Sequence, residues 1–259
     1  MNLQTFIDAI PSFLWSDGNG AASGLAVTAE LFLRSIVPGM ALAIAMAVGQ
    51  VYGPRGLALP IRAFTYFFRS TPLYLQLMLI YYGLSQFDIV QTGWMNDQPF
   101  WLLFRDATFC ATLALVLNTA AYVAELLAGM MVTFPRQEWV AGEAYGMGKW
   151  QIIRRLVLPA TLRRGIPALN NEMVFLLHAT SLASTVTLLD ITGVARAFYA
   201  MTYSPFIPFL MAAALYLLCT FLLIFTSRPP SGAGWRLSVA ASQERLMACS
   251  SVRVTILST

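Results

Sequence analysis

Charged residues are scarce in this chain of 259 residues, where Asp, Glu, Lys and Arg together make up 11% and apolar residues make up 58%. A soluble domain usually carries about 25% charged residues. A soluble globule of this size could not cover its surface with so few charges, which argues against an ordinary soluble enzyme. A largely disordered chain is excluded as well, because such chains are poor in apolar residues. The class that remains is an integral membrane protein.

Histidine and cysteine are also scarce, and this limits the chemistry that the chain can perform. His178 is the single histidine, and the three cysteines are scattered at Cys110, Cys219 and Cys249. Neither pattern predicts a metal site or a disulfide framework. The segment from Gly142 to Trp150 resembles a phosphate-binding loop only superficially, because it has one residue too many between its glycines and no Ser or Thr after Lys149. We therefore expect no enzymatic activity, no metal and no directly bound cofactor.

Long apolar stretches are what the chain has in place of charge. Each approaches or exceeds the ~20 residues that a helix needs to cross the hydrocarbon core of a bilayer. The sequence predicts an all-α membrane protein with five transmembrane helices. They run approximately over 27–51, 59–84, 100–131, 166–189 and 206–225, and the second is broken near Ser70-Thr71-Pro72.

The cations predict the orientation of these helices. Lys149 is the only lysine, and 15 of the 16 cationic residues are arginines. With the N-terminus outside and the C-terminus inside, the inner segments hold most of the cations and the outer segments only Arg105 and Arg196. This is the distribution that the positive-inside rule favours. We thus expect a periplasmic segment at 1–25, a transmembrane domain at 26–226, and a poorly ordered cytoplasmic tail at 227–259.

One inner loop, at about 132–165, is longer than a simple connection requires. Helical stretches are predicted on either side of Gly146-Met147-Gly148, and Pro159 is expected to end the second. Small residues around Gly142 would allow another surface to approach closely. From the residues alone, two interpretations stay open: an amphipathic hairpin lying on lipid headgroups, and a docking site for a cytoplasmic partner.

Several motifs together carry a family resemblance. The segment EAYGMGKWQIIRRLVLPATLRRGIPAL resembles the cytoplasmic loop of ABC-importer permeases, with Gly146 followed by nine residues and Leu156-Val157-Leu158-Pro159. Arg69-Ser70-Thr71-Pro72-Leu73 and Leu117-Asn118-Thr119-Ala120-Ala121-Tyr122-Val123-Ala124-Glu125 resemble motifs of polar amino-acid permeases. The likeness extends over about residues 25–225. It is strongest to the M-type permeases of histidine/lysine-arginine-ornithine and opine (octopine or nopaline) importers.

The resemblance implies an inner-membrane permease subunit of an ATP-binding-cassette importer for polar, most plausibly basic, amino acids or opines. It implies partners: a second, related permease chain, two ATP-binding subunits that carry the ATP and Mg²⁺, and an extracytoplasmic substrate-binding protein. No nucleic acid is implied. The residues expected to couple to the ATPase are Val140, Ala141, Gly142, Glu143, Ala144, Gly146, Leu158 and Pro159. Val140 stands where the family motif has Glu, and whether Glu138 or Glu143 replaces that acid stays open.

Five polar residues in the predicted spans are candidates for the substrate path. Glu125 and Asn118 lie two helical turns apart, and an acid within the bilayer should face a partner or a wet cavity. The alternatives for Glu125 are a structural pair with an arginine of another helix and a position near the membrane interface. Glu172 either lines the inner mouth of the path or caps a helix. Thr180 and Ser181 either contact substrate or serve helix packing.

Two further expectations come from spacing and from the number of spans. Glu30 and Arg34 are spaced i, i+4, which predicts an ion pair on one helix face. The alternative function, a self-sufficient secondary transporter or channel for small polar solutes, would require internal repeats and enough helices to enclose a path. A membrane enzyme would require a cluster of nucleophile and base, or of metal ligands, and neither pattern is present in the sequence.

Overall fold

The computed structural model describes residues 10–15 and 22–226, and within these ranges the regular elements are all helices. The predicted poorly ordered tail at 227–259 and most of the predicted periplasmic segment lie outside the described residues. The chain divides into two units, Met1–Leu223 and Ile224–Thr259, and the second contributes only residues 224–226 to the description.

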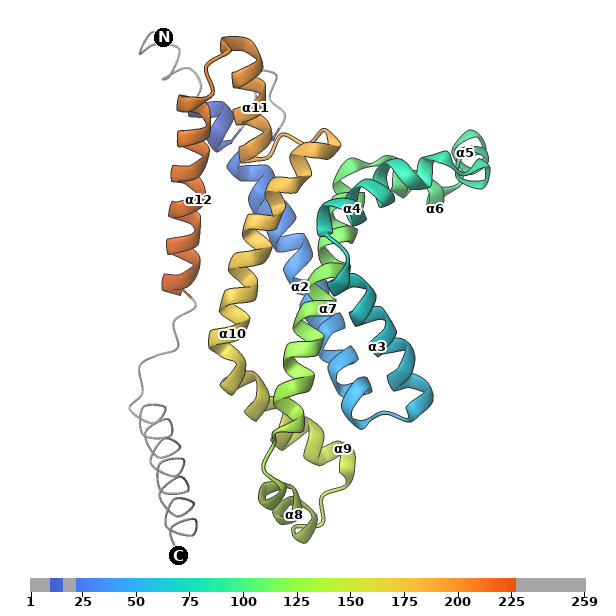
Figure 1. Cartoon of the computed structure of the whole chain (residues 1–259). Coiled ribbons are helices and arrows are strands. Elements are labelled where there is room, and N and C mark those ends of the chain that lie inside the picture. The colour runs from blue at the N-terminus through green and yellow to red at the C-terminus, as the bar shows by residue number, and fades with distance from the viewer. Residues whose placement is uncertain (1–9, 16–21, 227–259) are drawn as a thin grey trace, which may run out of the picture. The chain divides into compact units, whose positions relative to one another are not determined.

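The principal helices (Figure 1) are α2 (Leu25–Tyr52), α3 (Arg55–Ser70), α4 (Leu73–Met78), α5 (Asp88–Met95), α6 (Pro99–Leu102), α7 (Ala107–Val132), α8 (Arg136–Ala144), α9 (Lys149–Ile152), α10 (Leu158–Ala179), α11 (Ile191–Thr202) and α12 (Phe206–Thr226). Short 3₁₀ turns cover Leu84–Gln86, Leu103–Arg105 and Thr180–Val186, and π-helical turns cover Leu79–Gly83 and Ile153–Val157. The all-α class that the sequence predicts is confirmed.

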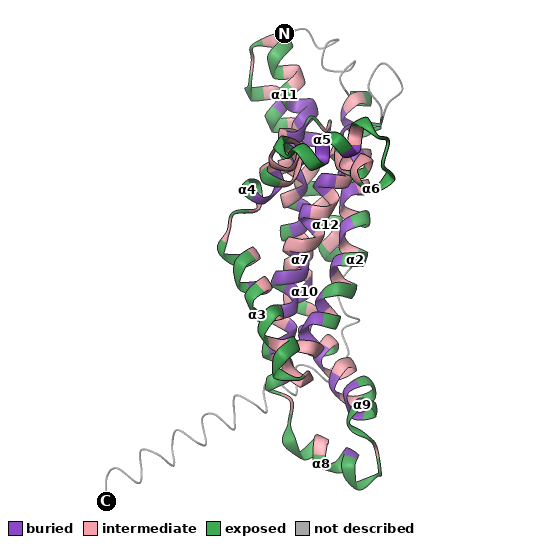
Figure 2. Cartoon of the chain, turned by 90° about the vertical axis from the view of Figure 1, so that its right-hand side faces the viewer, coloured by how far each residue is buried: buried purple, intermediate pink, exposed green. Residues whose placement is uncertain are grey.

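The core is built on α2 and α7, which pack closely because their facing residues are small. Gly39, Ala43 and Ala47 recur every fourth position on α2, and a Cβ added at Gly39 would lie 3.4 Å from the Thr119 side chain of α7. On α7 the matching residues are Ala120, Ala124 and Ala128, all of which are buried with Ala43 and Ala47 in one cluster. Small residues at this spacing let helix backbones approach, which is how helices associate in membranes. Figure 2 shows the buried residues concentrated along α7.

The predicted break at Thr71-Pro72 is confirmed. Helix α3 ends at Ser70, and Thr71 has an extended backbone. Pro72 has no N–H to donate to the Phe68 carbonyl, which would be its helical partner. The side-chain amide of Gln76 donates to that carbonyl at 2.8 Å, and the Asn118 amide approaches it at 3.5 Å. Two side chains therefore replace the missing backbone donor, and the break can persist inside the protein.

The expectation that Pro159 ends the helix after Gly148 is wrong. Helical backbone continues from Lys149 to Ala179, and Pro159 lies in the first turn of α10. A proline ring clashes with the carbonyl four residues earlier in a regular α-helix. Here the π-helical turn Ile153–Val157 precedes Pro159 and widens the backbone at the point where that clash would occur. The chain absorbs the proline without ending the helix.

Three described helices are long and apolar enough to cross a membrane: α2, α7 and α12. The predicted first and fifth spans match α2 and α12 closely. The third begins later than predicted, at Ala107, since residues 99–105 form separate short turns. The fourth begins earlier, since α10 starts at Leu158 and its first half carries Arg163 and Arg164. Five spans and their orientation stay predictions.

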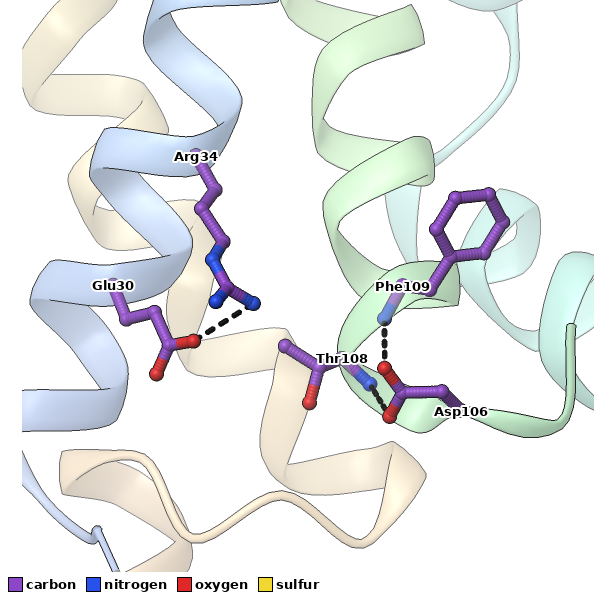
Figure 3. A network of polar contacts seen from close by, with 5 residues as sticks. All are labelled: Glu30, Arg34, Asp106, Thr108 and Phe109. Carbon is purple, nitrogen blue, oxygen red and sulfur yellow. Dashed lines mark hydrogen bonds and ion pairs between the residues drawn. The ribbon is translucent and has the colours of Figure 1, made fainter. Parts of the chain in front are cut away.

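Figure 3 shows two kinds of local polar contact, an ion pair within α2 and a capped N-terminus at the start of α7. The predicted ion pair of Glu30 and Arg34 is confirmed, with 2.8 Å between Oε1 and Nη1. Asp106 precedes α7 and its carboxylate accepts from the backbone N–H groups of Thr108 and Phe109 at 3.0 and 3.2 Å. This is the standard way to satisfy the free N–H groups at the start of a helix.

Candidate functional site

The loop at about 132–165, which we call the coupling loop after the role predicted for it, folds as a defined helical element with an exposed surface. Helix α8 ends in a turn in which the Gly146 N–H donates to the Glu143 carbonyl at 2.9 Å and the Met147 N–H donates to the Gly142 carbonyl at 3.1 Å. This bonding pattern is a Schellman cap, which needs a left-handed residue after the helix. Gly146 supplies it, with φ at +76°. The glycine that anchors the family resemblance is therefore the residue that turns the chain between α8 and α9.

Gly142 has a different role in the loop. It is the buried residue of α8, and a Cβ added there would lie 3.1 Å from the side chains of Ile152 and Leu156. The absent side chain lets α8 lie directly on the following helix. Four other residues of α8 were also predicted to couple to the ATPase, and all are exposed: Val140, Ala141, Glu143 and Ala144. Val140 exposes 53% of its surface. The loop thus presents a surface that a second protein can reach.

Aromatic and polar contacts fix this element to the end of α2. The Trp139 and Tyr52 rings stack with centroids 5.6 Å apart and planes 17° apart. The Trp139 indole N–H donates to the Glu143 carboxylate at 2.8 Å, and the Lys149 amine donates to the Tyr52 carbonyl at 3.3 Å. Of the two acids that could replace the missing motif Glu, Glu143 is the one that the structure ties into the loop. Leu158 and Pro159 are half-buried at the start of α10.

A pocket of about 590 Å³ lies beside the break between α3 and α4, and we call it the Glu172 pocket. Its polar wall is formed by Arg69, Ser70, Thr71, Asn118, Thr119, Tyr122 and Glu172. Asn118 and Glu172, predicted from the sequence to line a path, are brought together here from α7 and α10. The Asn118 amide also donates to the Gln76 side-chain oxygen at 3.3 Å. Asn118 therefore both lines the pocket and links α7 to α4.

A second pocket of about 650 Å³, the Glu125 pocket, is lined by Gln50, Val51, Arg62, Thr65, Tyr66, Arg69, Glu125, Ala128, Gly129 and Val132. The Glu125 carboxylate accepts from the Gln50 amide at 3.1 Å and from the Thr65 hydroxyl at 3.5 Å. These three side chains come from α2, α3 and α7. Glu125 makes no ion pair with any described residue, although Arg62 and Arg69 line the same pocket.

Thr180 and Ser181 are placed apart from both pockets. They begin the 3₁₀ turn that follows α10, and neither lines the Glu172 or the Glu125 pocket. The Thr180 hydroxyl is buried and donates to the Leu177 carbonyl at 2.7 Å. Their placement favours the packing alternative over contact with substrate.

A buried carboxylate that the sequence analysis did not single out lies at the start of α11. Asp190 is fully buried, and its carboxylate accepts from the N–H groups of Thr192 and Gly193 at 3.1 and 3.0 Å and from the Tyr216 hydroxyl at 3.1 Å. Burial raises its pKa to about 6, although these hydrogen bonds act in the opposite direction. An Asp directly before an apolar helical stretch, as in Asp190-Ile191-Thr192-Gly193, is an N-cap pattern that could have located it.

No group of three or more His, Cys, Asp or Glu residues within the described ranges could hold a metal ion. The two pockets instead combine carboxylates, amides, hydroxyls and guanidinium groups. Such groups recognise a polar solute by charge and hydrogen bonding.

Comparisons with known proteins agree with this architecture. The chain is 42% identical over 214 residues to the histidine/lysine/arginine/ornithine transport system permease protein HisM of Salmonella typhimurium, covering 82% of this chain and 88% of that protein. It is 38% identical over 212 residues to the octopine transport system permease protein OccM of Rhizobium radiobacter, covering 82% and 84%.

Solved structures share the fold. The crystal structure of an amino acid ABC transporter with histidines aligns with a TM-score of 0.72 at 24% identity, covering 88% of this chain and 96% of the other. The inward-facing MetNI methionine ABC transporter aligns with a TM-score of 0.60 at 16% identity. Residues 39–228 match a family of transport components, and on this evidence the chain belongs to the binding-protein-dependent transport system inner membrane components.

Proposed function

We propose that this permease subunit carries basic amino acids or opines across the inner membrane, and that the Glu172 pocket is where it receives them. The relatives named above transport histidine, lysine, arginine and ornithine, or octopine. The Glu172 carboxylate provides the complementary negative charge. A charged group within a membrane bundle should face a cavity or a partner, and Glu172 faces this pocket.

The observation that carries the proposal is the position of Glu172 opposite the broken helix at Thr71-Pro72. Irregular backbone within a membrane protein is tolerated where it is buried in protein or lines a cavity, and transporter sites are often built from interrupted helices. In this chain the break, Asn118 and Glu172 line the same pocket. The geometry supplies hydroxyl and amide groups beside a single carboxylate, which suits an amino acid with a cationic side chain.

Uptake by the complete transporter in proteoliposomes tests this site. Arginine, lysine, histidine, glutamine, octopine and nopaline are compared in the wild type and in Glu172→Gln. We expect the variant to lose uptake of arginine and lysine at least tenfold more than uptake of glutamine. Asp88→Asn, an exposed acid at the start of α5, is the matched control and should leave all rates unchanged. Equal loss for cationic and neutral substrates would refute the assignment.

We also propose that the coupling loop docks on a separate ATP-binding subunit. Its exposed α8, its Schellman cap and its attachment to Tyr52 support a rigid element that another protein can move. Gly146→Asp places a side chain at φ +76°, on the exposed turn, and is expected to abolish ATP-dependent uptake while the protein remains in the membrane.

Gly148→Asp is the control for that substitution. Gly148 has φ at −68° and precedes α9, where Asp is a favourable N-cap residue. It adds the same charge two residues away without backbone strain, so uptake should persist. Retained uptake in Gly146→Asp would rule out the docking assignment.

The remaining parts of the assembly follow from the same proposal. The permease has five spans with its N-terminus outside, and it forms the path together with a second, related permease chain. Two partner subunits bind and hydrolyse ATP with Mg²⁺, and an extracytoplasmic protein delivers the substrate. The alternative of a self-sufficient secondary transporter conflicts with membership of a family that depends on a binding protein.

A further inference from the structure

The Glu172 and Glu125 pockets follow one another along α7. Leu115, Asn118, Thr119 and Tyr122 line the first, and the second is lined by Glu125, Ala128, Gly129 and Val132. These residues form one continuous stripe of the helix, which leads toward the coupling loop. One residue, Arg69, lines both pockets. It therefore lies at the junction that a solute would pass on its way from one pocket to the other.

Arg69 is anchored through its backbone and ring contact, while its charged head is exposed. The Tyr122 hydroxyl donates to the Arg69 carbonyl at 3.3 Å, and the guanidinium carbon lies 5.6 Å from the centre of the Tyr122 ring. A guanidinium over an aromatic face is held by a cation–π attraction but keeps its hydrogen-bond donors available. Within the described residues it makes no ion pair.

Two carboxylates flank this guanidinium. Arg69 and Glu172 line the same pocket, so their opposite charges attract. On the other side, Arg69 shares the second pocket with Glu125. Glu125 receives hydrogen bonds from the neutral side chains of Gln50 and Thr65, so its negative charge is not neutralised by a described cation. A long, flexible cation thus lies between two acids that belong to consecutive pockets.

A cationic substrate and Arg69 would compete for the same acid. Like charges repel strongly where the dielectric constant is low, and a pocket within a membrane bundle is such a place. When arginine or lysine enters the Glu172 pocket, the other acid that shares a pocket with Arg69 is Glu125.

We infer that Arg69 is a specificity-determining residue that stands in for the cationic group of the substrate. Its positive charge attracts Glu172 across the pocket, without a direct ion pair, while the pocket is empty, and its side chain turns toward Glu125 when a basic amino acid enters. This inference rests on the proposed function of the Glu172 pocket. It adds that Glu125 acts as the second acid of the path by receiving Arg69, without contacting the substrate in the Glu172 pocket.

The inference is tested by whether replacing Arg69 strengthens or weakens the binding of arginine. Arginine is the probe, and its affinity for the purified transporter, complete with its ATP-binding subunits, is measured without ATP. Arg69→Gln removes the competitor, so arginine should bind at least threefold more tightly. If Arg69 instead bound the substrate carboxylate, or served only the fold, the same change would weaken binding or leave it unchanged, and either result would overturn the inference.

Two further variants keep the test decisive. Glu125→Gln removes the acid that receives Arg69, so arginine should bind at least threefold more weakly although the variant leaves the Glu172 pocket intact. Unchanged binding in this variant would also contradict the inference. Arg105→Gln is the matched control, because Arg105 is exposed and lines neither the Glu172 nor the Glu125 pocket, and its affinity should equal that of the wild type.

Failure of the inference can be separated from failure of the proposed function. If Glu172→Gln does not weaken arginine binding, the pocket itself is wrongly assigned. If Glu172→Gln weakens binding but Arg69→Gln does not tighten it, the pocket stands and the role of Arg69 is wrong. Apparent melting temperatures of all variants, measured in the same detergent, show which of them are folded. If Arg69→Gln does not fold, the arginine affinity of Glu125→Gln tests the inference in its place.

Discussion

Asn in place of Asp190 should make the stability of this permease less dependent on pH. In the folded protein burial raises the pKa of Asp190 from 3.8 to about 6. Each pKa unit corresponds to about 1.4 kcal/mol, so the full effect is about 3 kcal/mol. Because the folded pKa lies above the unfolded value, the folded state binds the proton more tightly. The stabilisation is present at low pH and is lost as pH rises from about 4 to about 6.

Thermal unfolding of the detergent-purified permease between pH 4.5 and 7.5 measures this effect. Over that interval Asp190 contributes about 2 kcal/mol of the change, which corresponds to about 4–8 °C in the apparent melting temperature of a chain of this size. The wild type should lose this much relative to Asp190→Asn as the pH rises. Asn preserves an N-cap acceptor, so the helix start is retained.

Asp106→Asn is the control for the same experiment. Asp106 caps α7 with two similar hydrogen bonds but is exposed, whereas Asp190 is fully buried. Its replacement should not remove the loss of stability with rising pH that Asp190 causes. If Asp190→Asn shows the same pH dependence as the wild type, or if Asp106→Asn removes it equally, the argument from burial is refuted.

Two further predictions concern packing and the helix break. Gly142→Leu should detach α8 from the following helix, because the new side chain would collide with Ile152, and limited proteolysis should then cleave the loop faster than in the wild type. Gln76→Leu should lower the melting temperature, since the part-buried Phe68 carbonyl loses its shorter hydrogen bond and keeps only the longer one from Asn118, and a lost hydrogen bond costs about 1 kcal/mol. Gln91→Leu, which removes an exposed amide-to-carbonyl bond, should have a much smaller effect on the melting temperature.

The sequence predicted those features that depend on local chemistry. Pro72 lacks a backbone N–H and disfavours helix at Thr71, so the break was predictable. The Glu30–Arg34 pair was predictable as well, from its one-turn spacing. The helices α2 and α12 were predicted closely because their apolar runs end abruptly in Gly, Pro or polar residues. Local reasoning failed at Pro159, since a π-helical turn several residues earlier relieved the clash that a regular helix would suffer.

The pockets could be predicted only in part. Asn118, Glu125 and Glu172 were identified because polar groups in apolar segments are costly and stand out. Which of them share a pocket depends on how α3, α7 and α10 pack, and no spacing within one helix contains that information. Tyr122 was the exception, because it lies one turn from both Asn118 and Glu125 and could have been found by helical periodicity. The burial of Asp190 depends on contact with Tyr216, which is distant in sequence.

The attachment of the coupling loop to Tyr52 has a mechanical consequence. Tyr52 is the last residue of α2, and Gln50, which holds the Glu125 carboxylate, lies within the same helical turn. A helix backbone is stiff over one turn. A displacement of Tyr52 through its contact with the Trp139 ring should therefore move Gln50 as well, and with it the hydrogen bond that Gln50 donates to the half-buried Glu125 carboxylate.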